Sequence, residues 1–581
     1  MAKHKARNDS SDTRSLLQPD EEEKKQQQQQ EKEGNLESTS RGRLVRDGGV
    51  EEEKNHVGSL ESTSRGRPVG GEEEEGLSFA LAGLKFIHQC RRNLGELKFS
   101  STHAVLIDTV LFKRKLGNIP HEGKDVWLPH FVKMPCSKAL SQHGSSQELR
   151  WKTIFKRLSA LAQKQEVSVS ELEEAIMKYN SKYQGRWSFD ALRSLIKSDH
   201  NSQIYYRRLF PKIAALALRL PQEVKTAVPL LQSGSSLSIT LSQTQISVLL
   251  ANAFLCTFPH RNSSGPNTEY HNYPTINFSS LFADFSLRKR EKLRAILHYF
   301  AVVTDEKTKP KGLVTFERRC LKNADMPNWK RCNEKMNRLY VMSHGQIEKE
   351  GAGLLQVDFA SSWIGGGILG SGLVQEEILF LMNPELIVSR LFTEKLADNE
   401  CLLITGSQQF SLYSGYSDSF QWVGPNDDTL NRDSWDRLNR QILALDALHF
   451  REIREQYNNK NIKRELNKAY CGFRGDPGLE EPDVATGKWG CGAFNGDPQL
   501  KALIQLMAAA KAGRGLAFFT FDDRRLTTEL QQVYSLLVED SITVGKLYNL
   551  LKDFCSNVDK GLYVDLFDFI KRKLRPKQSH L

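Results

Sequence analysis

The sequence predicts an α/β fold in which helices layer a β-sheet, preceded by an α-helical region and a polar tail. Three observations support this prediction. After about residue 310, short apolar runs alternate with helical patterns, which is typical of a sheet covered by helices. Before that point, apolar residues recur at helical spacing. The first 76 residues are mostly polar and charged, so they bury too little apolar area to fold.

The predicted disordered tail spans residues 1–76 and includes the glutamine run Gln26–Gln30. It carries the sequence LESTSRGR twice, at 36–43 and again at 60–67. Two polar copies do not make a solenoid, which needs stacked apolar faces. Two interpretations stay open: a short duplication without function, or a tandem phosphorylation or docking motif. A second short tail is predicted at residues 576–581.

A helical accessory region is predicted over residues 77–235. Its amphipathic helices are expected over residues 151–161, 170–179, 188–196 and 206–220. A more apolar helix should follow at 243–258, with Ser242 as its N-terminal cap.

The α/β region is predicted over residues 236–575, with further helices toward its C-terminal end. Strands are expected over residues 312–317, 338–342, 354–359, 401–405, 441–446 and 516–521. Asn383 followed by Pro384 is a typical helix start, and Asp497 followed by Pro498 repeats it before a helix over 500–512.

Composition limits the function classes. The formal net charge of +11 suits a polyanionic partner, although a protein with one basic face remains an equal alternative. Nine scattered cysteines without CxxC spacing predict reduced thiols and no zinc site. The N-terminus has no apolar core of a signal peptide, and the longest apolar run, 248–258, is too short to span a bilayer. We therefore expect a soluble intracellular protein without a membrane partner.

The most informative segment is the glycine run Gly365–Gly367, which follows the apolar run 354–359. Glycine lets backbone N–H groups approach a phosphate closely. The run also matches the G-x-G-x-x-G pattern through Gly370, but no helix follows at once and the next strand ends without an acid. For these reasons a dinucleotide site is disfavoured. A P-loop is disfavoured as well, because no GxxxxGK[ST] is present.

Two adjacent carboxylates, Glu376 and Glu377, come about ten residues after the glycine run. If they open a helix, their side chains diverge by about 100°, so both cannot aim at one atom. One acid would then perform general acid or base chemistry while the other orients a hydroxyl. The alternative is an ordinary acidic first turn that complements the helix dipole.

Taken together, these segments resemble the poly(ADP-ribose) glycohydrolase family. The resemblance covers most of the chain beyond residue 235 and rests on SVLLANAFLCTFP, VDFA, GGG followed by QEE, NPELIVSRLFTEKL, LYSGY, ALDALHF, ELNKAYCGF and ATGKWGCGAF. It implies a macrodomain, a three-layer mixed sheet with helices on both faces, behind a helical accessory domain. It implies no cofactor and no metal.

The resemblance also implies an activity: hydrolysis of the ribose–ribose O-glycosidic bonds of poly(ADP-ribose), with release of ADP-ribose. Glu377 would protonate the leaving ribose hydroxyl and then activate water. Gln375 and Glu376 would hold the ribose hydroxyls and the acid, and Asp358 would support the loop that carries them. Gly365, Gly366 and Gly367 would wrap the diphosphate. An oxocarbenium-like transition state beside a bound diphosphate agrees with this assignment.

Further substrate contacts follow from the matching positions. Ile347 and Glu348 would lie near the adenine, and Tyr416 and Phe521 would cover the adenosine and the reacting ribose, with Tyr413 close by. Lys488, Gly492 and Phe494 belong to the block that the family uses beside the phosphates. For the three aromatic residues, packing in the core is the alternative interpretation.

The resemblance implies partners and a location as well: poly(ADP-ribose) on modified nuclear proteins, a part in the DNA damage response, and a nuclear or cytoplasmic protein. The basic cluster Lys571–Lys573 agrees with a nuclear location, although such runs are often solvated faces. No direct nucleic-acid site is predicted.

Four positions depart from the family pattern. Ser361 and Lys488 stand where the family usually has asparagine, and Asn495 and Asp522 stand where it usually has glycine. If the backbone has positive φ at the last two, Asn and Asp are the least costly replacements. Because GGG and QEE are intact, we expect an active or attenuated enzyme. A non-catalytic reader of ADP-ribose, or a hydrolase of single ADP-ribose groups, stays open as an alternative.

Overall fold

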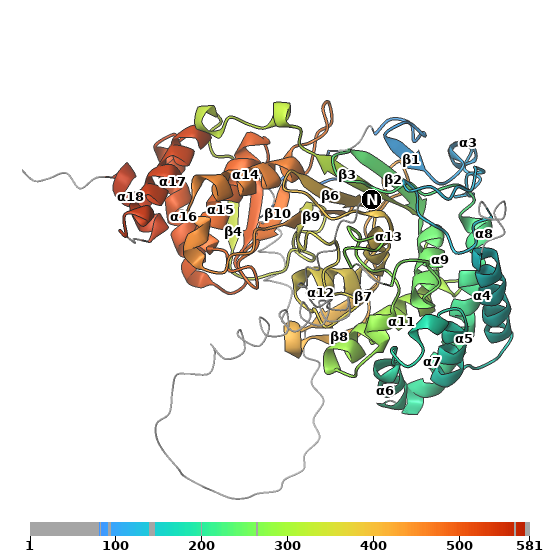
Figure 1. Ribbon diagram of the computed structural model, residues 1–581. Coiled ribbons are helices and arrows are strands. Elements are labelled where there is room, and N and C mark those ends of the chain that lie inside the picture. Colours follow the sequence, from blue (N-terminus) through green and yellow to red (C-terminus); the bar gives the residue numbers. More distant parts are fainter. Residues whose placement is uncertain are drawn as a thin grey trace, which may run out of the picture. The chain divides into compact units, whose positions relative to one another are not determined.

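The computed structural model describes residues 81–575, except 82, 91–93, 139–145, 199, 263–264 and 563–564 (Figure 1). The predicted tails 1–76 and 576–581, with the duplicated motif, lie outside these residues. The described helices and strands all belong to one compact unit.

The described residues form a nine-stranded mixed sheet in the order β1-β2-β3-β6-β9-β5-β10-β11-β4. Strands β9, β5, β10, β11 and β4 are parallel, whereas β2, β3, β6 and β9 pair antiparallel. A separate pair, β7 and β8, is antiparallel. The strands are β1 (His103–Val105), β2 (Leu237–Ser242), β3 (Leu313–Cys320), β4 (Leu339–Met342), β5 (Leu355–Ala360), β6 (Glu400–Thr405), β7 (Ser411–Ser414), β8 (Gln421–Pro425), β9 (Gln441–Asp446), β10 (Val484–Gly487) and β11 (Leu516–Phe519).

All six strands predicted from the sequence are present, as β3, β4, β5, β6, β9 and β11. Short or partly polar strands were missed. Strand β1 lies inside the predicted helical region and pairs with β2, so that region is not helical throughout. Strand β10 has only four residues, Val-Ala-Thr-Gly, which is too short for a period-2 pattern to be recognised.

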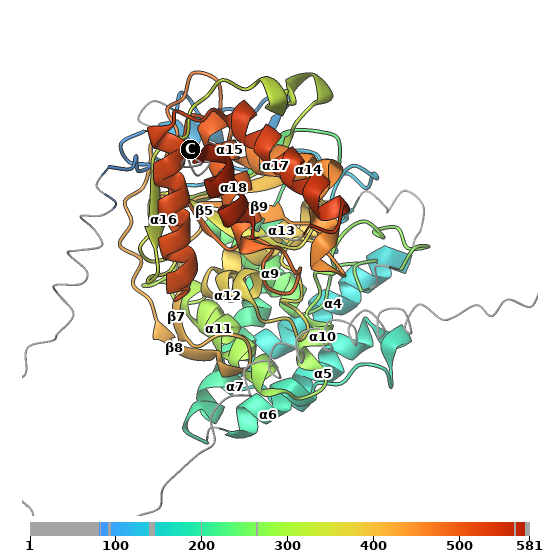
Figure 2. The same ribbon diagram turned by 90° about the vertical axis from the view of Figure 1, so that its left-hand side faces the viewer.

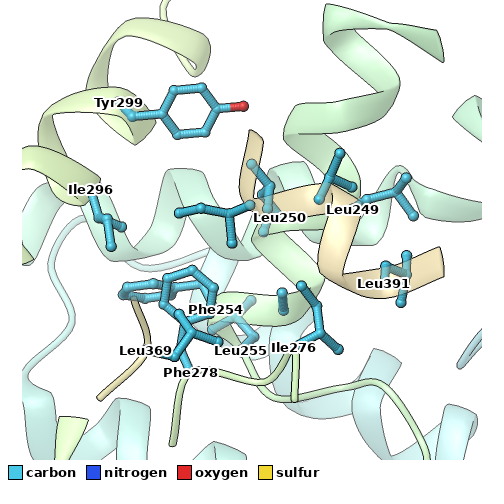
Figure 3. Packing of buried hydrophobic residues seen from close by; sticks show 14 of the residues in the cluster. Leu249, Leu250, Phe254, Leu255, Ile276, Phe278, Ile296, Tyr299, Leu369 and Leu391 are labelled. Carbon is cyan, nitrogen blue, oxygen red and sulfur yellow. The ribbon is translucent and has the colours of Figure 1, made fainter. Parts of the chain in front are cut away.

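One face of the sheet is covered by helices that share a large apolar core, including α9 and α12. Leu369, from the loop after β5, belongs to the same core as Phe254 and Phe278 (Figure 3). The helices on this side are α4 (Ser146–Ala162), α5 (Val169–Lys178), α6 (Asp190–Ser198), α7 (His200–Leu218), α8 (Leu220–Glu223), α9 (Gln243–Phe254), α10 (Ser279–Phe282), α11 (Leu287–Val303), α12 (Gln375–Met382) and α13 (Ser389–Phe392).

Because α7 packs against both α9 and α11, helices from either side of residue 235 share this core. The domain boundary placed there stays a prediction. A short helix, α3 (Thr109–Lys113), lies between β1 and α4 in the chain.

The other face is covered by α14, α15 and α16, the last of which packs on β4, and α17 and α18 pack against α15 (Figure 2). These are α14 (Asn459–Phe473), α15 (Pro498–Lys511), α16 (Arg524–Glu539), α17 (Val544–Asp559) and α18 (Leu566–Leu574). Helices therefore lie on both faces, and the predicted three-layer α/β architecture is confirmed.

Two of the three predicted helix caps are present. The Ser242 hydroxyl accepts from Gln245 N at 3.1 Å, and the Asp497 carboxylate accepts from Leu500 N at 2.7 Å. The Asn383 cap was wrong. Its side chain donates backwards to the Leu379 carbonyl, and Pro384–Val388 forms only a 3₁₀ turn, η5.

All nine cysteines are present as free thiols. No helix among the described residues combines the length and apolar character needed to cross a bilayer. The same residues contain no group of three metal-ligating side chains.

Candidate active site

The candidate site lies where parallel strands end at one edge of the sheet. In the register, Ala360 at the end of β5 faces Asp446 at the end of β9, and Gly487 at the end of β10 faces Phe519 of β11. The segments that follow these strands therefore meet at one edge, the usual position for a ligand in a parallel sheet. We call residues 361–374 after β5 the glycine loop, and residues 488–496 after β10 the open-amide loop.

The glycine loop is held by the first turn of α12. The Glu376 carboxylate accepts from Ser361 N at 2.8 Å and Gly365 N at 2.6 Å. The Glu377 carboxylate accepts from Gly367 N at 2.7 Å and Val374 N at 2.9 Å. Both side chains are almost fully buried, at 2% and 5% exposure. The two acids therefore diverge, as helix geometry predicts, and each holds a different part of the loop.

This arrangement corrects one predicted role. Gly365 and Gly367 donate their amides to the two glutamates, and Gly366 donates to the Trp363 carbonyl at 2.9 Å. The three amides that we expected to wrap a diphosphate therefore already donate to protein acceptors. In this conformation they are not available to bind a diphosphate.

Glycine is needed at these positions for a different reason. Gly366 has φ of +43°, and a Cβ there would lie 2.5 Å from Glu377 Oε1 and 2.9 Å from Glu376 Oε2. A side chain would displace both carboxylates. The glycine run therefore makes room for the two acids to reach the loop backbone.

Behind the loop lies a third carboxyl group, Asp358 on β5, which is fully buried. Neither of its oxygens has a hydrogen-bond partner among the described residues. Burial, and then the nearby charge of Glu377, raise the pKa of Asp358 well above its ordinary value. Burial also raises the pKa of Glu376, with Asp358 and Glu377 adding to the effect. Burial therefore favours the protonated form of Asp358 and of Glu376, and a general acid site needs a protonated carboxyl group.

Gln375 links the helix back to β5. Its Oε1 accepts from Phe359 N at 2.8 Å, and its Nε2 donates to the Val357 carbonyl at 3.4 Å. In this arrangement the side chain joins α12 to the strand that carries Asp358.

Sequence reasoning missed two buried cations that hold the other side of the loop. Lys292 on α11 donates to the carbonyls of Gly367, Ile368 and Gly370. Arg390 on α13 donates to the carbonyls of Ile364 and Gly366. Burial lowers the pKa of Lys292 to about 7 and that of Arg390 to about 10. A sequence signal existed for Lys292, which occupies a position of the apolar stripe formed by Ala295 and Tyr299.

The residues predicted to contact the adenosine are also brought together. The Tyr413 hydroxyl donates to the Glu348 carboxylate. Burial raises the pKa of both groups above their ordinary values. The Ile347 carbonyl accepts from Gln356 Nε2 at 2.9 Å, and Tyr416 lies exposed on the turn between β7 and β8. An exposed tyrosine is not core packing, so the packing alternative fails for Tyr416.

The open-amide loop differs from the glycine loop. The amides of Gly492, Ala493 and Phe494 donate no hydrogen bond to the described part of the chain. Gly492 and Ala493 are exposed, whereas Phe494 is half-buried with its ring 5.5 Å from that of His449. Lys488 lies at the start of the loop, with Nζ 3.9 Å from Asp523 Oδ2. Free amides beside a cation form a suitable site for an anion.

Backbone conformation supports two predictions made from the family pattern. Asn495 and Asp522 have φ of +57° and +63°, so both replace glycine where positive φ is needed. Phe521 also has positive φ, +51°, which is costly for a bulky residue and is typical of functional sites. A Cβ at Gly487 would lie 2.8 Å from the Phe521 ring, so this ring covers the end of β10.

Ser361 still makes the hydrogen bond that holds the carboxylate of Glu376. Its backbone amide, not its side chain, binds Glu376, and its hydroxyl accepts from Trp363 N at 3.2 Å. Replacing the usual asparagine therefore leaves the anchor of Glu376 in place.

Comparison with known proteins identifies the family to which the fold belongs. Residues 326–528 match the family model described as poly (ADP-ribose) glycohydrolase, macro domain fold, and residues 197–318 match the model of its helical domain. The poly(ADP-ribose) glycohydrolase 1 of Arabidopsis thaliana is 31% identical over 438 residues, which are 61% of this chain and 79% of that protein. The poly(ADP-ribose) glycohydrolase 1 of Caenorhabditis elegans is 35% identical over 282 residues, 45% of this chain and 35% of that protein.

The fold and the site thus define a hydrolase built on a macrodomain behind a helical domain. The chain belongs to the poly(ADP-ribose) glycohydrolase family.

Proposed function

We propose that this protein hydrolyses the ribose–ribose O-glycosidic bonds of poly(ADP-ribose) and releases ADP-ribose, with Glu377 as general acid and base. The observation that carries the proposal is the anchoring of Glu377 by Gly367 N and Val374 N at the C-terminal edge of the sheet. A carboxylate has about four acceptor positions, so two amide contacts leave capacity for a substrate hydroxyl.

In the proposed reaction, the Glu377 carboxyl gives its proton to the oxygen of the leaving ribose. The anomeric C–O bond then breaks through an oxocarbenium-like state. Water adds to the anomeric carbon and returns a proton to Glu377, which restores the acid. Burial raises the pKa values of the adjacent Glu376 and Asp358, which limits the negative charge beside Glu377.

We place the diphosphate at the open-amide loop. The amides of Gly492, Ala493 and Phe494, which bind no acceptor among the described residues, fit phosphate oxygens, and Lys488 adds a positive charge at the start of the loop. Negative charge held there would stabilise the positive charge that develops on the ribose. Glu348, Ile347 and Tyr413 would contact the adenine, while Tyr416 and Phe521 would cover the nucleoside.

A non-catalytic reader of ADP-ribose is the second candidate, and Ser361 and Lys488 favour it because they depart from the family pattern. Against it, Glu377 and both of its amide anchors are in place. The Ser361 amide also still binds Glu376.

The test is release of free ADP-ribose from purified poly(ADP-ribosyl)ated protein, measured for the wild type and Glu377→Gln. The matched control is Glu385→Gln, since Glu385 is also buried but binds Gln243 and Gln408 instead of the glycine loop. We expect Glu377→Gln to lose at least ~10³-fold in rate, as for removal of a general acid and its positioning. Glu385→Gln should stay close to the wild type.

If the wild type and Glu377→Gln release equally little but both bind the polymer, the reader function stands instead. Substrate carrying single ADP-ribose groups, tried in the same assay, separates polymer hydrolysis from removal of the last unit.

Poly(ADP-ribosyl)ated nuclear proteins as partners, a role in the DNA damage response and a nuclear or cytoplasmic location are proposals that follow from this substrate. Imaging of the tagged full chain before and after DNA damage checks them. Absence from both compartments would contradict the location.

A further inference from the structure

Two buried cations, Arg390 and Lys292, bind the backbone carbonyls of the glycine loop. Arg390 binds the carbonyls of Ile364 at 2.7 Å and Gly366 at 3.0 Å. Lys292 binds those of Gly367 at 2.9 Å, Ile368 at 3.2 Å and Gly370 at 2.9 Å. Both cations are buried, and Lys292 is fully so. A buried lysine is expensive unless its charge is well satisfied, and here three carbonyls of one loop satisfy it.

Gly367 connects this cation to the proposed acid. Its N–H donates to Glu377 Oε1 at 2.7 Å, and its carbonyl accepts from Lys292 Nζ at 2.9 Å. One peptide segment thus lies between a buried ammonium and a buried carboxylate. A shift of Gly367 would move the amide that holds Glu377 and would also break its bond to Lys292.

Lys292 reaches the loop from a different part of the chain. It lies in α11, which packs directly against α12, the helix that carries Glu377. Its neighbours on the same helix face, Ala295, Ile296 and Tyr299, belong to the apolar core. A methionine at this position would fit that core, so apolar packing alone does not call for lysine.

We propose that Lys292 is a positioning residue for Glu377: its ammonium fixes the carbonyls of Gly367, Ile368 and Gly370 and thereby holds the Glu377 carboxyl at the reacting bond. This inference rests on the proposed function for its catalytic readout. The lowered pKa of Lys292, with Glu377 as the charge that opposes the lowering, agrees with a close coupling of the two groups.

The alternative is an ordinary buried lysine that only supports the fold. Lys289 provides the matched control, since it lies one turn earlier on α11, is also buried, and donates to the Ala283 carbonyl at 2.7 Å, outside the glycine loop. Lys292→Met and Lys289→Met remove the same group from the same helix.

The experiment compares the wild type, Lys292→Met and Lys289→Met in two ways. The first is hydrogen–deuterium exchange of peptides covering residues 361–374, which needs no activity. The second is the kcat and KM for release of ADP-ribose from polymer. Lys292→Gln, which keeps amide donors without the charge, replaces the Met variant if that variant does not fold.

We expect Lys292→Met to raise exchange in the glycine loop and to lower kcat by ~10²-fold, the usual cost of misplacing a catalytic group by about 1 Å. KM should change less than about threefold, because the open-amide loop is untouched. Lys289→Met should change neither the exchange of the loop nor kcat by more than about twofold.

Equal exchange and equal kcat in the two Met variants would overturn the proposal, as would a loss confined to KM. If the wild type itself releases no ADP-ribose, the proposed function fails, and the exchange comparison still decides whether Lys292 holds the loop.

Discussion

The glycine loop and the open-amide loop leave the same edge of the sheet, and both are rich in glycine, yet they use their backbones in opposite ways. In the glycine loop, the amides of Gly365, Gly366 and Gly367 all bind protein acceptors. In the open-amide loop, the amides of Gly492, Ala493 and Phe494 bind no described acceptor. A glycine run therefore does not by itself identify a phosphate site. Here the amides of the glycine loop hold Glu376 and Glu377, whereas the amides of the open-amide loop are available to bind an anion.

The sharpest way to break this comparison is Gly366→Ala. Its Cβ would meet Glu377 Oε1 at 2.5 Å and Glu376 Oε2 at 2.9 Å, so both carboxylates must move. We expect kcat to fall by ~10²-fold or more. Gly478→Ala is the control, because Gly478 also has positive φ, +83°, but open space around it. Unchanged kcat in Gly366→Ala would show that the glycine loop does not position the acid.

The open-amide loop is tested by Lys488→Ala. If this loop holds the diphosphate, loss of the nearby cation should weaken ADP-ribose binding by about 3- to 10-fold, more strongly at low salt. The rate of the chemical step should change little. Isothermal titration calorimetry at two salt concentrations gives the affinity, with Lys552→Ala on α17 as a control for removal of a charge. Tighter binding by Lys488→Ala would mean that the lysine obstructs the site.

The buried cation of the glycine loop predicts a pH dependence. Burial lowers the pKa of Lys292 to about 7, whereas the unfolded chain keeps the ordinary value of 10.5. Between these values the unfolded state binds more protons, so Lys292 makes the free energy of unfolding rise with pH. The rise is at most about 1.4 kcal/mol per pH unit.

Urea denaturation of the wild type and Lys292→Met between about pH 7 and pH 9 measures this effect. The wild type should gain stability relative to the variant as the pH rises. If the difference in the free energy of unfolding between the wild type and Lys292→Met stays constant or shrinks as the pH rises, Lys292 is not a desolvated cation.

The smallest expected effect is that of Ser361→Asn, which restores the residue usual in the family. Because the Ser361 backbone amide, and not its hydroxyl, binds Glu376, we expect kcat to change less than about threefold. Steady-state kinetics on polymer checks this. A rise of ~10²-fold would mean that an asparagine side chain contacts the substrate and that the protein is strongly attenuated.

Much of the fold follows from the sequence, because β3, β4, β5, β6, β9 and β11 are apolar runs with clear boundaries. The positive φ at Asn495 and Asp522 agrees with the glycines that the family usually has there, and α12 begins at Gln375, so that Glu376 and Glu377 do open a helix. Local patterns failed where a tertiary contact decides. Asn383 followed by Pro384 is typical of a helix N-terminal cap, but the Asn383 side chain donates to the Leu379 carbonyl instead.

The candidate site shows the same division. Its position after β5 and its acids could be read from GGG and QEE. The partners of each glycine amide could not, since they depend on how Glu376 and Glu377 fold back over the loop. Lys292 was missed because it lies far from the loop in the sequence and meets it only through the packing of α11 on α12.

The most direct test of the contrast between the two loops is residue-resolved hydrogen–deuterium exchange with and without ADP-ribose. We predict that Gly365 and Gly367 exchange slowly even without ligand, and that ADP-ribose slows exchange mainly at Gly492, Ala493 and Phe494. Fast exchange at Gly365 and Gly367 that slows on adding ADP-ribose, with no change at the other three amides, would contradict the account.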